Sequence, residues 1–379
     1  VAISSLFCAL SVSGIMLIIC RLVQGIGSAM IFGTGMAIIT SAFPPHERGK
    51  AIGINVSAVY LGLSIAPFAG GFFTQLLGWR SLFLMTLPFA ILVVIFVVLF
   101  FKSEWADARH EKFDYTGSVI YIIAVSLLMY GFSKLPETYA FFLTGTGIIG
   151  LVLFIRIELS RKYPVLDIRL FRANRTFAFS NLAALINYAA TFAITFVLSL
   201  YLQYIKGMKP IQAGSVLVTQ PFIMMIVASF SGRMSDRRDP RILSSLGMAI
   251  IVAGLVLLSF LENNTGKVYI IFSLLILGTG FGLFSSPNTN AIMGSVEKKY
   301  LGIASATVGT MRLTGQMVSM GVATMIIHAL LGEESISMSN HHLFLTSVRI
   351  IFILFSFLCF LGIFASLARG KSKSIHDNH

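Results

Sequence analysis

Four residues suited to charge or close-packing chemistry lie together in the run Arg21-Leu-Val-Gln24-Gly25-Ile-Gly27, inside a long apolar stretch. A guanidinium at membrane depth is costly and normally faces a water-filled cavity or a partner group. Arg21 is therefore expected to face such a cavity or partner group. The alternative is an arginine that reaches back to the membrane interface, because Arg21 lies shortly after the polar turn at Ser11 to Gly14.

A second apolar stretch begins at Gly53 and reads GINVSAVYLGLSIAPFAGG. Gly53, Gly62, Gly70 and Gly71 would let a neighbouring helix approach closely, as small residues do in bilayers. Pro67 removes one backbone donor and predicts a bend. A bent helix with close-packed faces suits an element that rocks against a partner, and the alternative is a generic kinked membrane helix.

These two runs resemble known motifs at the residue level. The spacing Gly-x8-Gly-x3-Ala-Pro-x2-Gly-Gly resembles the antiporter motif of the major facilitator superfamily, although that family usually has glycine where this chain has Ala66. The run with Arg21, Gln24 and Gly25 resembles the Arg-x-x-Gln-Gly-x-Gly motif of the family's fourth helix, and this resemblance implies a role in proton coupling. The connector with Pro164 and Asp167 is similar to the one that follows two extra helices in the family's fourteen-helix drug exporters.

The resemblance implies a drug:proton antiporter of the fourteen-helix type. The expected fold has two pseudo-symmetric helical bundles around a central cavity, with two extra helices between them in sequence. The expected mechanism is alternating access, driven by the proton gradient without a bound cofactor. The implied partners are protons and a small-molecule substrate, and we expect a monomer in the lipid bilayer.

The start of the chain affects the expected proton pathway. In the family, the arginine that Arg21 matches faces an acidic residue of the first helix. This chain begins at Val1 within an apolar run, and its Asp and Glu residues fall in loops, at helix ends or in the tail. We therefore expect an N-terminally truncated chain that lacks the first two helices, part of the third and the proton carrier, and that does not transport alone.

Polar residues inside the later apolar spans are candidate substrate contacts, because polar groups in a span need partners or water. By the resemblance, the span with Asn181, Asn187 and Tyr188 would line the central cavity. Interhelical hydrogen bonds would explain each of these residues equally well.

Two further polar sites lie in the following spans. Asn288 and Asn290 flank Pro287, where a broken helix would expose its backbone to a substrate. Arg312 and Gln316 lie one turn apart on one face of the next span. Arg312 is far from both predicted ends of its span, so we expect it to line a cavity or to cap carbonyl groups.

The run Gly232-Arg-Met-Ser-Asp236-Arg237-Arg238 lies at a predicted helix end. A carboxylate among arginines can form a charge-assisted latch that holds two bundles together. The run resembles the second-half copy of the family's Gly-x-Leu-Ala-Asp-Arg loop, with Asp239 in place of an expected glycine. The alternative is a solvated basic turn.

The composition is that of a polytopic membrane protein. Hydrophobic residues make up 56% of the 379 residues and charged residues 11%, and the mean hydropathy is +0.87. A bilayer core takes about 20 apolar residues per helix, and the chain has about eleven such complete segments and one partial one at its start. No soluble globular domain of this size has such a composition.

The residues that give the net charge of +13 are concentrated in alternate loops. Most of the 28 lysine and arginine residues lie in alternate loops, around Arg48, Arg161, Arg237 and Lys298 and in the tail. The positive-inside rule therefore predicts a cytoplasmic C-terminus. We expect a multi-pass protein of the plasma membrane. A nucleic-acid partner is not expected.

An internal repeat supports two related halves. Four glycine pairs share a separation of 253 residues: Gly25 with Gly278, Gly27 with Gly280, Gly49 with Gly302 and Gly62 with Gly315. Two parallel repeats are a known transporter architecture. The expected parts are the remainder of an N-terminal bundle (1–101), two extra central helices with their connectors (102–174), a C-terminal six-helix bundle (175–368) and a polar cytoplasmic tail (369–379).

Other functions are less compatible with the sequence. An enzyme needs convergent nucleophile, base or metal-ligand groups, and the chain has no His-Glu-x-x-His, Gly-x-Ser-x-Gly or P-loop run. We therefore predict no catalytic residue and no metal site. An exporter of one metabolite, amino acid or siderophore remains an alternative within transport, and a membrane sensor remains one outside it.

Overall fold

The computed structural model describes residues 1–100, 114–135, 137–161, 164–166, 168–332, 336 and 340–370, except for the side chains at positions 67, 68, 71 and 133. These ranges contain helices and their connections and no strand. Eleven of their helical segments are long and apolar enough to cross a membrane. The all-α polytopic class is therefore confirmed.

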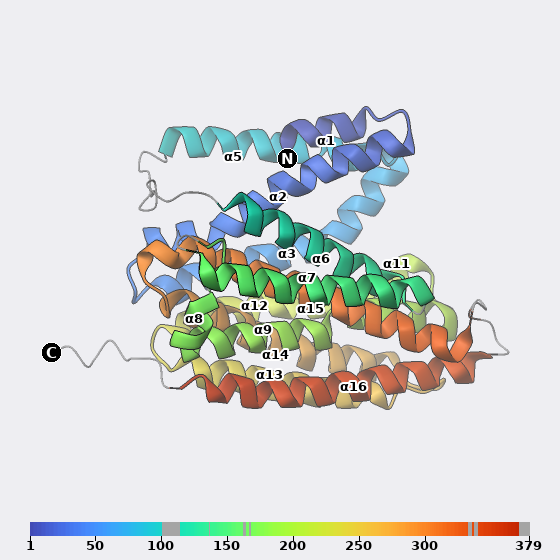
Figure 1. The fold of residues 1–379 in the computed structure, drawn as a ribbon. Coiled ribbons are helices and arrows are strands. Elements are labelled where there is room, and N and C mark those ends of the chain that lie inside the picture. The colour runs from blue at the N-terminus through green and yellow to red at the C-terminus, as the bar shows by residue number, and fades with distance from the viewer. Residues whose placement is uncertain are drawn as a thin grey trace.

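Figure 1 shows the arrangement of the helices. In chain order they are α1 (Ala2–Ala9), α2 (Gly14–Ala42), α3 (Arg48–Leu77), α4 (Ser81–Leu84), α5 (Thr86–Phe100), α6 (Tyr115–Ser133), α7 (Thr138–Ser160), α8 (Ile168–Ala173), α9 (Arg175–Thr191), α10 (Ile194–Leu200), the π-helical turn η1 (Tyr201–Ile205), α11 (Pro210–Leu217), α12 (Thr219–Ser235), α13 (Pro240–Ser259), α14 (Lys267–Gly294), the 3₁₀ turn η2 (Lys298–Tyr300), α15 (Leu301–Leu331) and α16 (His341–Ala368).

The C-terminal helices enclose the main apolar core. α13 packs along α14 and α16, α12 packs along α14, and α9 packs against α15 and α16. Side chains such as Ile251, Leu274 and Phe352 are fully buried between these helices. In lipid this packing holds the bundle by close contact of side chains.

The N-terminal helices join this bundle through α2 and α3. α3 packs along α12, and α2 packs along α15. Ile52 and Val56 of α3 belong to the same buried cluster as the C-terminal helices. In contrast, α5 buries none of its residues, and α1 and α5 lie in a separate layer above the bundle in Figure 1.

The helices α6 and α7 pack along each other, and α6 also contacts α15. The contact with α15 is close, because a methyl group added at Gly321 would lie 2.8 Å from the ring of Phe132. These are the two helices that the sequence analysis placed between the halves.

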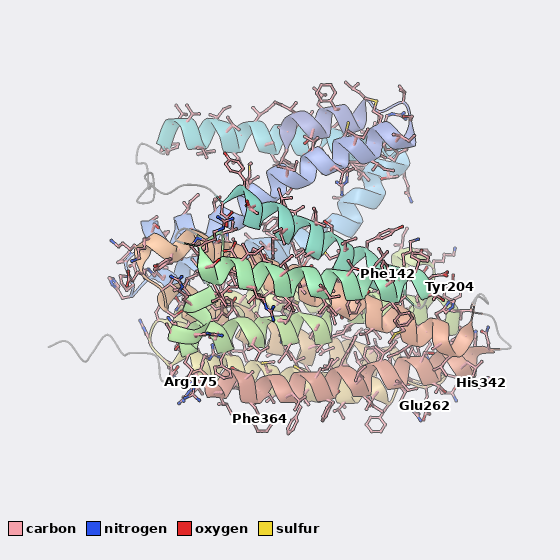
Figure 2. All side chains as sticks on the ribbon, in the orientation of Figure 1. Phe142, Arg175, Tyr204, Glu262, His342 and Phe364 are labelled. Atoms are coloured by element: carbon pink, nitrogen blue, oxygen red, sulfur yellow. The ribbon has the colours of Figure 1, made fainter. Side chains whose placement is uncertain are left out.

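The two ends of the molecule are polar and its flanks are apolar. α2, α12 and α16 end, and α3 begins, at one end, which we call the Asp236 end. Figure 2 places Arg175 at this end and Glu262 and His342 at the opposite end, whereas Phe364 projects from a flank. A bundle that spans a bilayer requires this distribution.

The predicted span 175–205 is interrupted. α9 ends at Thr191 and α10 begins at Ile194, and the freed N–H of Ala193 donates to Ser319 Oγ at 3.0 Å. A side chain of α15 thus satisfies a buried backbone donor of the broken helix.

Two expectations from the sequence are wrong. Pro287 lies inside α14, which continues to Gly294 without unwinding, and α12 and α13 pack along it. Arg369, assigned above to a solvated tail, is 2% exposed and belongs to the C-terminal bundle.

The internal repeat has a counterpart in helix contacts. A methyl group added at Gly27 would lie 2.9 Å from the backbone nitrogen of Val1, next to α1, and one at Gly280 would lie 2.8 Å from Ile251 of α13. At an offset of 253, Val1 corresponds to Gly254, which lies on α13. Equivalent glycines therefore contact equivalent segments, and the superposition of the two halves stays a prediction.

Candidate functional site

Backbone contact between glycines joins α3 to α12 near the Asp236 end. A methyl group added at Gly53 would lie 3.0 Å from Gly232 Cα, and one added at Gly232 would lie 2.6 Å from Gly53 Cα. One added at Gly49 would overlap the carbonyl oxygen of Gly232. We call Gly49, Gly53 and Gly232 the glycine seam. The close approach predicted for Gly53 is confirmed by these distances.

Asp236 closes the seam at its end. Its Oδ1 accepts the N–H of Gly49 at 2.6 Å, and its Oδ2 accepts the N–H of Lys50 at 2.8 Å. α3 begins at Arg48, so both N–H groups belong to the first turn, where a helix has no acceptors of its own. A carboxylate is also favoured there by the positive end of the helix dipole.

The partner of Asp236 is therefore a helix terminus and not an arginine. Arg237 is exposed and is not the group that holds the Asp236 carboxylate in this structure. Burial raises the pKa of Asp236, while the N–H groups of Lys50 and Gly49 hold it down. The contact is thus a directional one that two backbone donors create and that burial weakens.

Serine hydroxyls continue the α3–α12 contact beyond the glycines. Ser57 Oγ donates to the carbonyl oxygen of Met225 at 2.7 Å and lies 2.8 Å from Ser229 Oγ. Gly62 lies on the opposite face of α3 from Gly53, and a methyl group added there would meet no atom within 4 Å. The expected close packing at Gly62 is therefore wrong for this structure.

The rest of the predicted motif is only partly described. A methyl group at Gly70 would reach Leu82 at 3.7 Å, which is an ordinary contact within the N-terminal helices. The surroundings of Pro67 and Gly71 lie outside the described residues. The seam thus occupies about the first half of α3.

Arg21 is held by a short polar chain. Its Nη1 donates to Gln24 Oε1 at 2.6 Å, and Gln24 Nε2 donates to Ser5 Oγ of α1 at 2.6 Å. The guanidinium lies 5.9 Å from the ring centre of Phe83. A methyl group added at Gly25 would meet no atom within 4 Å. The structure therefore brings Arg21 and Gln24 together and places no carboxylate of the described residues in an ion pair with Arg21.

An aromatic and cationic cluster lies where α3, α9, α14 and α15 meet. The Arg312 guanidinium lies over the ring of Tyr188 at 5.2 Å. Phe281 packs edge-on against Tyr188 at 5.5 Å and against Tyr60 at 6.3 Å. Gln316, one turn after Arg312, is half-buried. Because Tyr60 belongs to α3 and the others to the C-terminal bundle, this cluster spans the two halves.

The four asparagine candidates differ in their surroundings. Asn288 donates to Ser180 O at 3.1 Å, and Asn290 donates to Ser235 Oγ at 3.0 Å. These two amides therefore join helices. Asn181 donates to its own helix at Phe177 O. Asn187 is fully buried, and its side-chain nitrogen and oxygen both lack a partner.

Arg369 forms a network that the sequence analysis missed. Its guanidinium donates to Ser180 Oγ at 3.2 Å, Asn288 Oδ1 at 3.1 Å and Ser366 Oγ at 2.6 Å, and its Nε donates to Ser366 O at 2.8 Å. Burial lowers the pKa of Arg369 to about 10, so the group stays charged at neutral pH. This arginine ties α9 and α14 to the end of α16.

The family follows from a match along the chain. The model of the Major Facilitator Superfamily matches residues 1–320 and residues 182–376. The chain belongs to the major facilitator superfamily. Its family and its structural neighbours are transporters, which agrees with the predicted non-enzymatic role.

Several relatives share this membership. The riboflavin transporter RibZ of Clostridioides difficile is 29% identical over 313 residues, which cover 82% of this chain and 68% of that protein. The multidrug resistance protein Stp of Mycobacterium tuberculosis is 27% identical over 331 residues, or 86% of this chain. This chain covers 61% of the length of Stp.

Solved structures share the fold. The human organic anion transporter MFSD10 aligns with a TM-score of 0.65 at 15% identity, over 96% of this chain and 74% of that one. The proton:xylose symporter XylE aligns with a TM-score of 0.59 at 15% identity, over 96% of this chain and 76% of XylE. The major facilitator fold is therefore confirmed.

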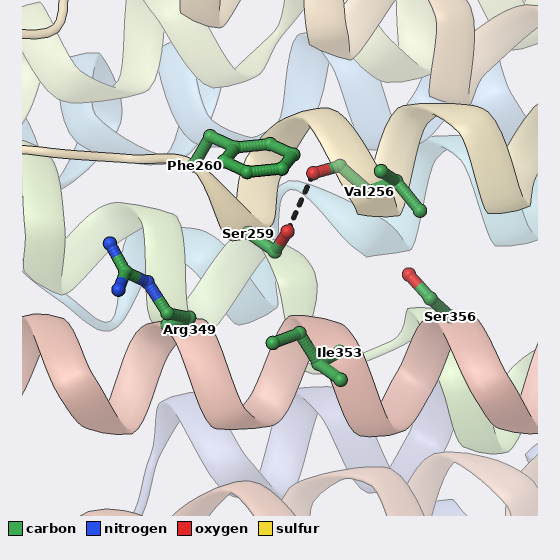
Figure 3. Close-up of a pocket in the computed structure, with 6 residues that line it drawn as sticks. All are labelled: Val256, Ser259, Phe260, Arg349, Ile353 and Ser356. Atoms are coloured by element: carbon green, nitrogen blue, oxygen red, sulfur yellow. Dashed lines mark hydrogen bonds between the residues drawn. The ribbon is translucent and has the colours of Figure 1, made fainter.

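A separate pocket of about 350 Å³ opens between α13 and α16. Figure 3 shows its lining, which includes Arg349, Ile353, Ser259 and Ser356. Both helices belong to the C-terminal bundle, so a movement of one half against the other would not open or close this pocket. We therefore do not assign it to the transport pathway of this family member.

The sequence held signals for some of the missed residues. Ser57 and Tyr60 lie four and seven residues after Gly53, which places them on the same face of α3. Extending the glycine pattern along that face would have found both. Arg369 carried no such signal, because a basic residue after an apolar span is what the positive-inside rule alone predicts.

Proposed function

We propose that this chain is a proton-coupled antiporter that exports amphipathic small molecules by alternating access. Its two halves would close at the Asp236 end through the glycine seam and would part there when the opposite end closes. The observation that carries the proposal is the contact of Asp236 with the first turn of α3, across 187 residues of sequence.

The chemistry of this contact suits a reversible closure. Two hydrogen bonds to a charged acceptor contribute a few kcal/mol at most. Glycine backbones that touch across the seam allow close approach without interlocked side chains. The closed arrangement is therefore specific in geometry and modest in free energy, as a transporter that alternates between two states requires.

Arg21 and Gln24 would supply the coupling. The Gln24–Ser5 hydrogen bond holds the Arg21 guanidinium within the N-terminal half. A cation at that position lowers the free energy of an ionised carboxylate nearby. Protonation of such a carboxylate would remove the attraction and change which arrangement of the halves is stable.

The relatives support the class of substrate only broadly. The names of the similar proteins include multidrug resistance proteins and a riboflavin transporter. We propose a plasma-membrane monomer with the Asp236 end and the C-terminus in the cytoplasm, because the basic loops lie at that end. The similarity to RibZ favours one alternative, a transporter dedicated to a single metabolite.

Proton exchange in everted membrane vesicles tests the proposal. The protein would be expressed from its native coding sequence, and the vesicles would be acidified by respiration. We expect rhodamine 123 or fluorescein to release protons from wild-type vesicles on addition. Arg21→Ala should abolish this release at unchanged protein level, whereas Arg349→Gln, which changes an exposed arginine of α16, should preserve it. Proton release that survives Arg21→Ala would contradict the proposed coupling.

A further inference from the structure

Arg312 is a cation placed deep within a membrane-spanning helix. Arg312 lies eleven residues into the 31-residue helix α15, about 17 Å from its start at 1.5 Å per residue. This depth is within the hydrocarbon region, where an unpaired cation is costly. Its Nε is buried and has no hydrogen-bond partner.

The helices around the junction of the halves supply no negative charge. α2, α3, α9, α12, α14 and α15 contain neither aspartate nor glutamate. The ion pairs of the described residues join Arg161 to Asp114, Arg241 to Asp239 and Lys299 to Glu297. The side chains of Tyr188 and Tyr60 lie near Arg312 instead, and both are neutral at physiological pH.

The Arg312 guanidinium has an aromatic ring on its face and an Nε–H without a partner at its edge. The ring of Tyr188 lies against the guanidinium and provides a cation–π interaction. The five N–H donors of a guanidinium point outward in its plane, in a fork that matches carboxylate, sulfonate or phosphate oxygens. An anion at the edge of Arg312 would therefore complete the coordination that the protein leaves unfinished.

The neighbouring rings add a preference for shape. Tyr60, Tyr188 and Phe281 are 6–8% exposed, and their edge-on packing brings three aromatic rings to one place. Tyr60 would move with α3 when the halves part, and the other two rings would stay on the C-terminal bundle. A planar aromatic ligand could then replace the contact between Tyr60 and Phe281.

We propose that the Arg312 cluster binds substrates that are planar, aromatic and negatively charged, in preference to organic cations. This inference rests on the proposed transport function and gives its substrate class. Arg312 would bind the acidic group of the substrate, Tyr188 would support the guanidinium, and Tyr60 and Phe281 would contact the rings. The proposed preference for anions distinguishes this protein from exporters whose acidic side chains bind cationic compounds.

Two xanthene dyes of opposite charge provide the test. The protein, expressed from its native coding sequence and placed in lipid nanodiscs, would be titrated into fluorescein and into rhodamine 123 at pH 7.5, with fluorescence anisotropy as the readout. We expect fluorescein to bind at least about tenfold more tightly. Equal binding of the two dyes, or tighter binding of rhodamine 123, would overturn the inference.

Variants locate the binding at Arg312. Arg312→Gln should weaken fluorescein binding about tenfold or more and leave rhodamine 123 binding nearly unchanged. Arg312→Lys keeps the charge but lacks the planar fork, so its affinity for fluorescein should lie between those of the wild type and Arg312→Gln. Arg349→Gln is the matched control in another span and should change neither affinity.

The outcomes separate the substrate class from the transport function. If Arg312→Gln is not monodisperse, Arg312→Lys decides, and an unchanged fluorescein affinity in that variant contradicts the role of Arg312. Arg312-dependent fluorescein binding without proton exchange would sustain this inference and refute the antiport. Proton-coupled efflux that favours rhodamine 123 in the wild type would sustain the antiport and refute the proposed substrate class.

Discussion

Two arginines of the C-terminal bundle have opposite surroundings. Arg369 donates to Ser180, Asn288 and Ser366, all within one half of the molecule. Arg312 lies where the halves meet and has a buried Nε without a partner. In our account, the donor nitrogens of Arg369 all have partners in one half because these contacts hold throughout the transport cycle. The Nε of Arg312 has no partner because it lies where contacts form and break.

The same difference separates the network of Arg369 from the contact of Asp236. Asp236 lies at the same end of the molecule but reaches across to α3 with only two hydrogen bonds. The network of Arg369 is therefore buried within one half, whereas the Asp236 contact is directional and crosses between helices that also pack along each other. Four predictions test this division, in order of decreasing effect.

Arg369→Met should cause the largest loss of stability. The substitution strands buried acceptors on Asn288 and Ser180, and each unsatisfied group costs about 1–3 kcal/mol. We expect a marked fall in the thermal midpoint of the solubilised protein, measured by size-exclusion chromatography with fluorescence detection. Arg349→Met, at an exposed arginine, should change stability by about 0.5 kcal/mol or less. A similar midpoint for both variants would contradict the structural role of Arg369.

Gly232→Val should abolish closure of the Asp236 end while the C-terminal bundle remains folded. Even a methyl group at this position would lie 2.6 Å from Gly53 Cα, so α3 and α12 would be forced apart. We expect transport to fall at least about tenfold, with little change in the thermal midpoint. Gly62→Val is the matched control on α3, since its side chain meets open space. Full transport by Gly232→Val would show that the seam does not need to close.

Asp236→Asn should shift the equilibrium between the two arrangements without preventing either. The amide keeps one acceptor for the N–H of Gly49 or Lys50, but its NH2 group cannot accept the other N–H, which the carboxylate bonds with its second oxygen. The loss is about 1 kcal/mol, or roughly fivefold in the population of the closed end. Spin labels on Lys50→Cys and Arg237→Cys would report this as a larger fraction of long distances. An unchanged distance distribution would contradict the role of Asp236.

Acidification should have the smallest effect and should favour the closed end. Burial raises the pKa of Asp236 in the closed arrangement, where His46 and Glu47 are its charged neighbours, above the usual 3.8 that an open, solvated carboxyl would have. The arrangement with the higher pKa binds a proton more readily, so its relative population rises as the pH falls through that raised pKa. The same spin labels should show this trend in the wild type and lose it in Asp236→Asn. A shift of the wild type toward long distances at low pH would have the wrong sign.

Much of the fold was accessible from the sequence because it depends on local patterns. Apolar length alone predicted the membrane spans, and small residues at Gly53 predicted close packing there. The partner of Asp236 was not predictable in this way. It lies 187 residues away, and a helix N-terminus offers its N–H groups whatever its side chains are.

Two errors in the sequence analysis have physical causes. The backbone around Pro287 was expected to unwind, but α14 continues through it with α12 and α13 packed along it. The neighbouring Asn288 accepts a hydrogen bond from Arg369, and its contact with substrate stays a prediction. Gly62 was expected to pack closely because its spacing from Gly53 fits a motif, yet nine residues at 3.6 per turn place it on the opposite face of α3, where a methyl group would meet no atom within 4 Å. Spacing predicts that residues share a helix, and it does not predict that each of them contacts a neighbouring helix.

The central claim is that α3 and α12 must separate during each transport cycle. Ser57 Oγ and Ser229 Oγ lie 2.8 Å apart across this contact, so Ser57→Cys with Ser229→Cys should form a disulfide between the halves. Ser245→Cys with Ser366→Cys provides a matched disulfide within the C-terminal half, where the hydroxyls are also 2.8 Å apart. Both pairs would be built in a chain with alanine at Cys8, Cys20 and Cys359.

The decisive measurement is dye efflux by each pair before and after oxidation, followed by reduction with dithiothreitol. Our account predicts that oxidation of the Ser57–Ser229 pair stops efflux and that reduction restores it. The oxidised Ser245–Ser366 pair should transport as its reduced form does. Unimpaired efflux with a complete disulfide between residues 57 and 229 would show that α3 and α12 do not part, and the account would be wrong.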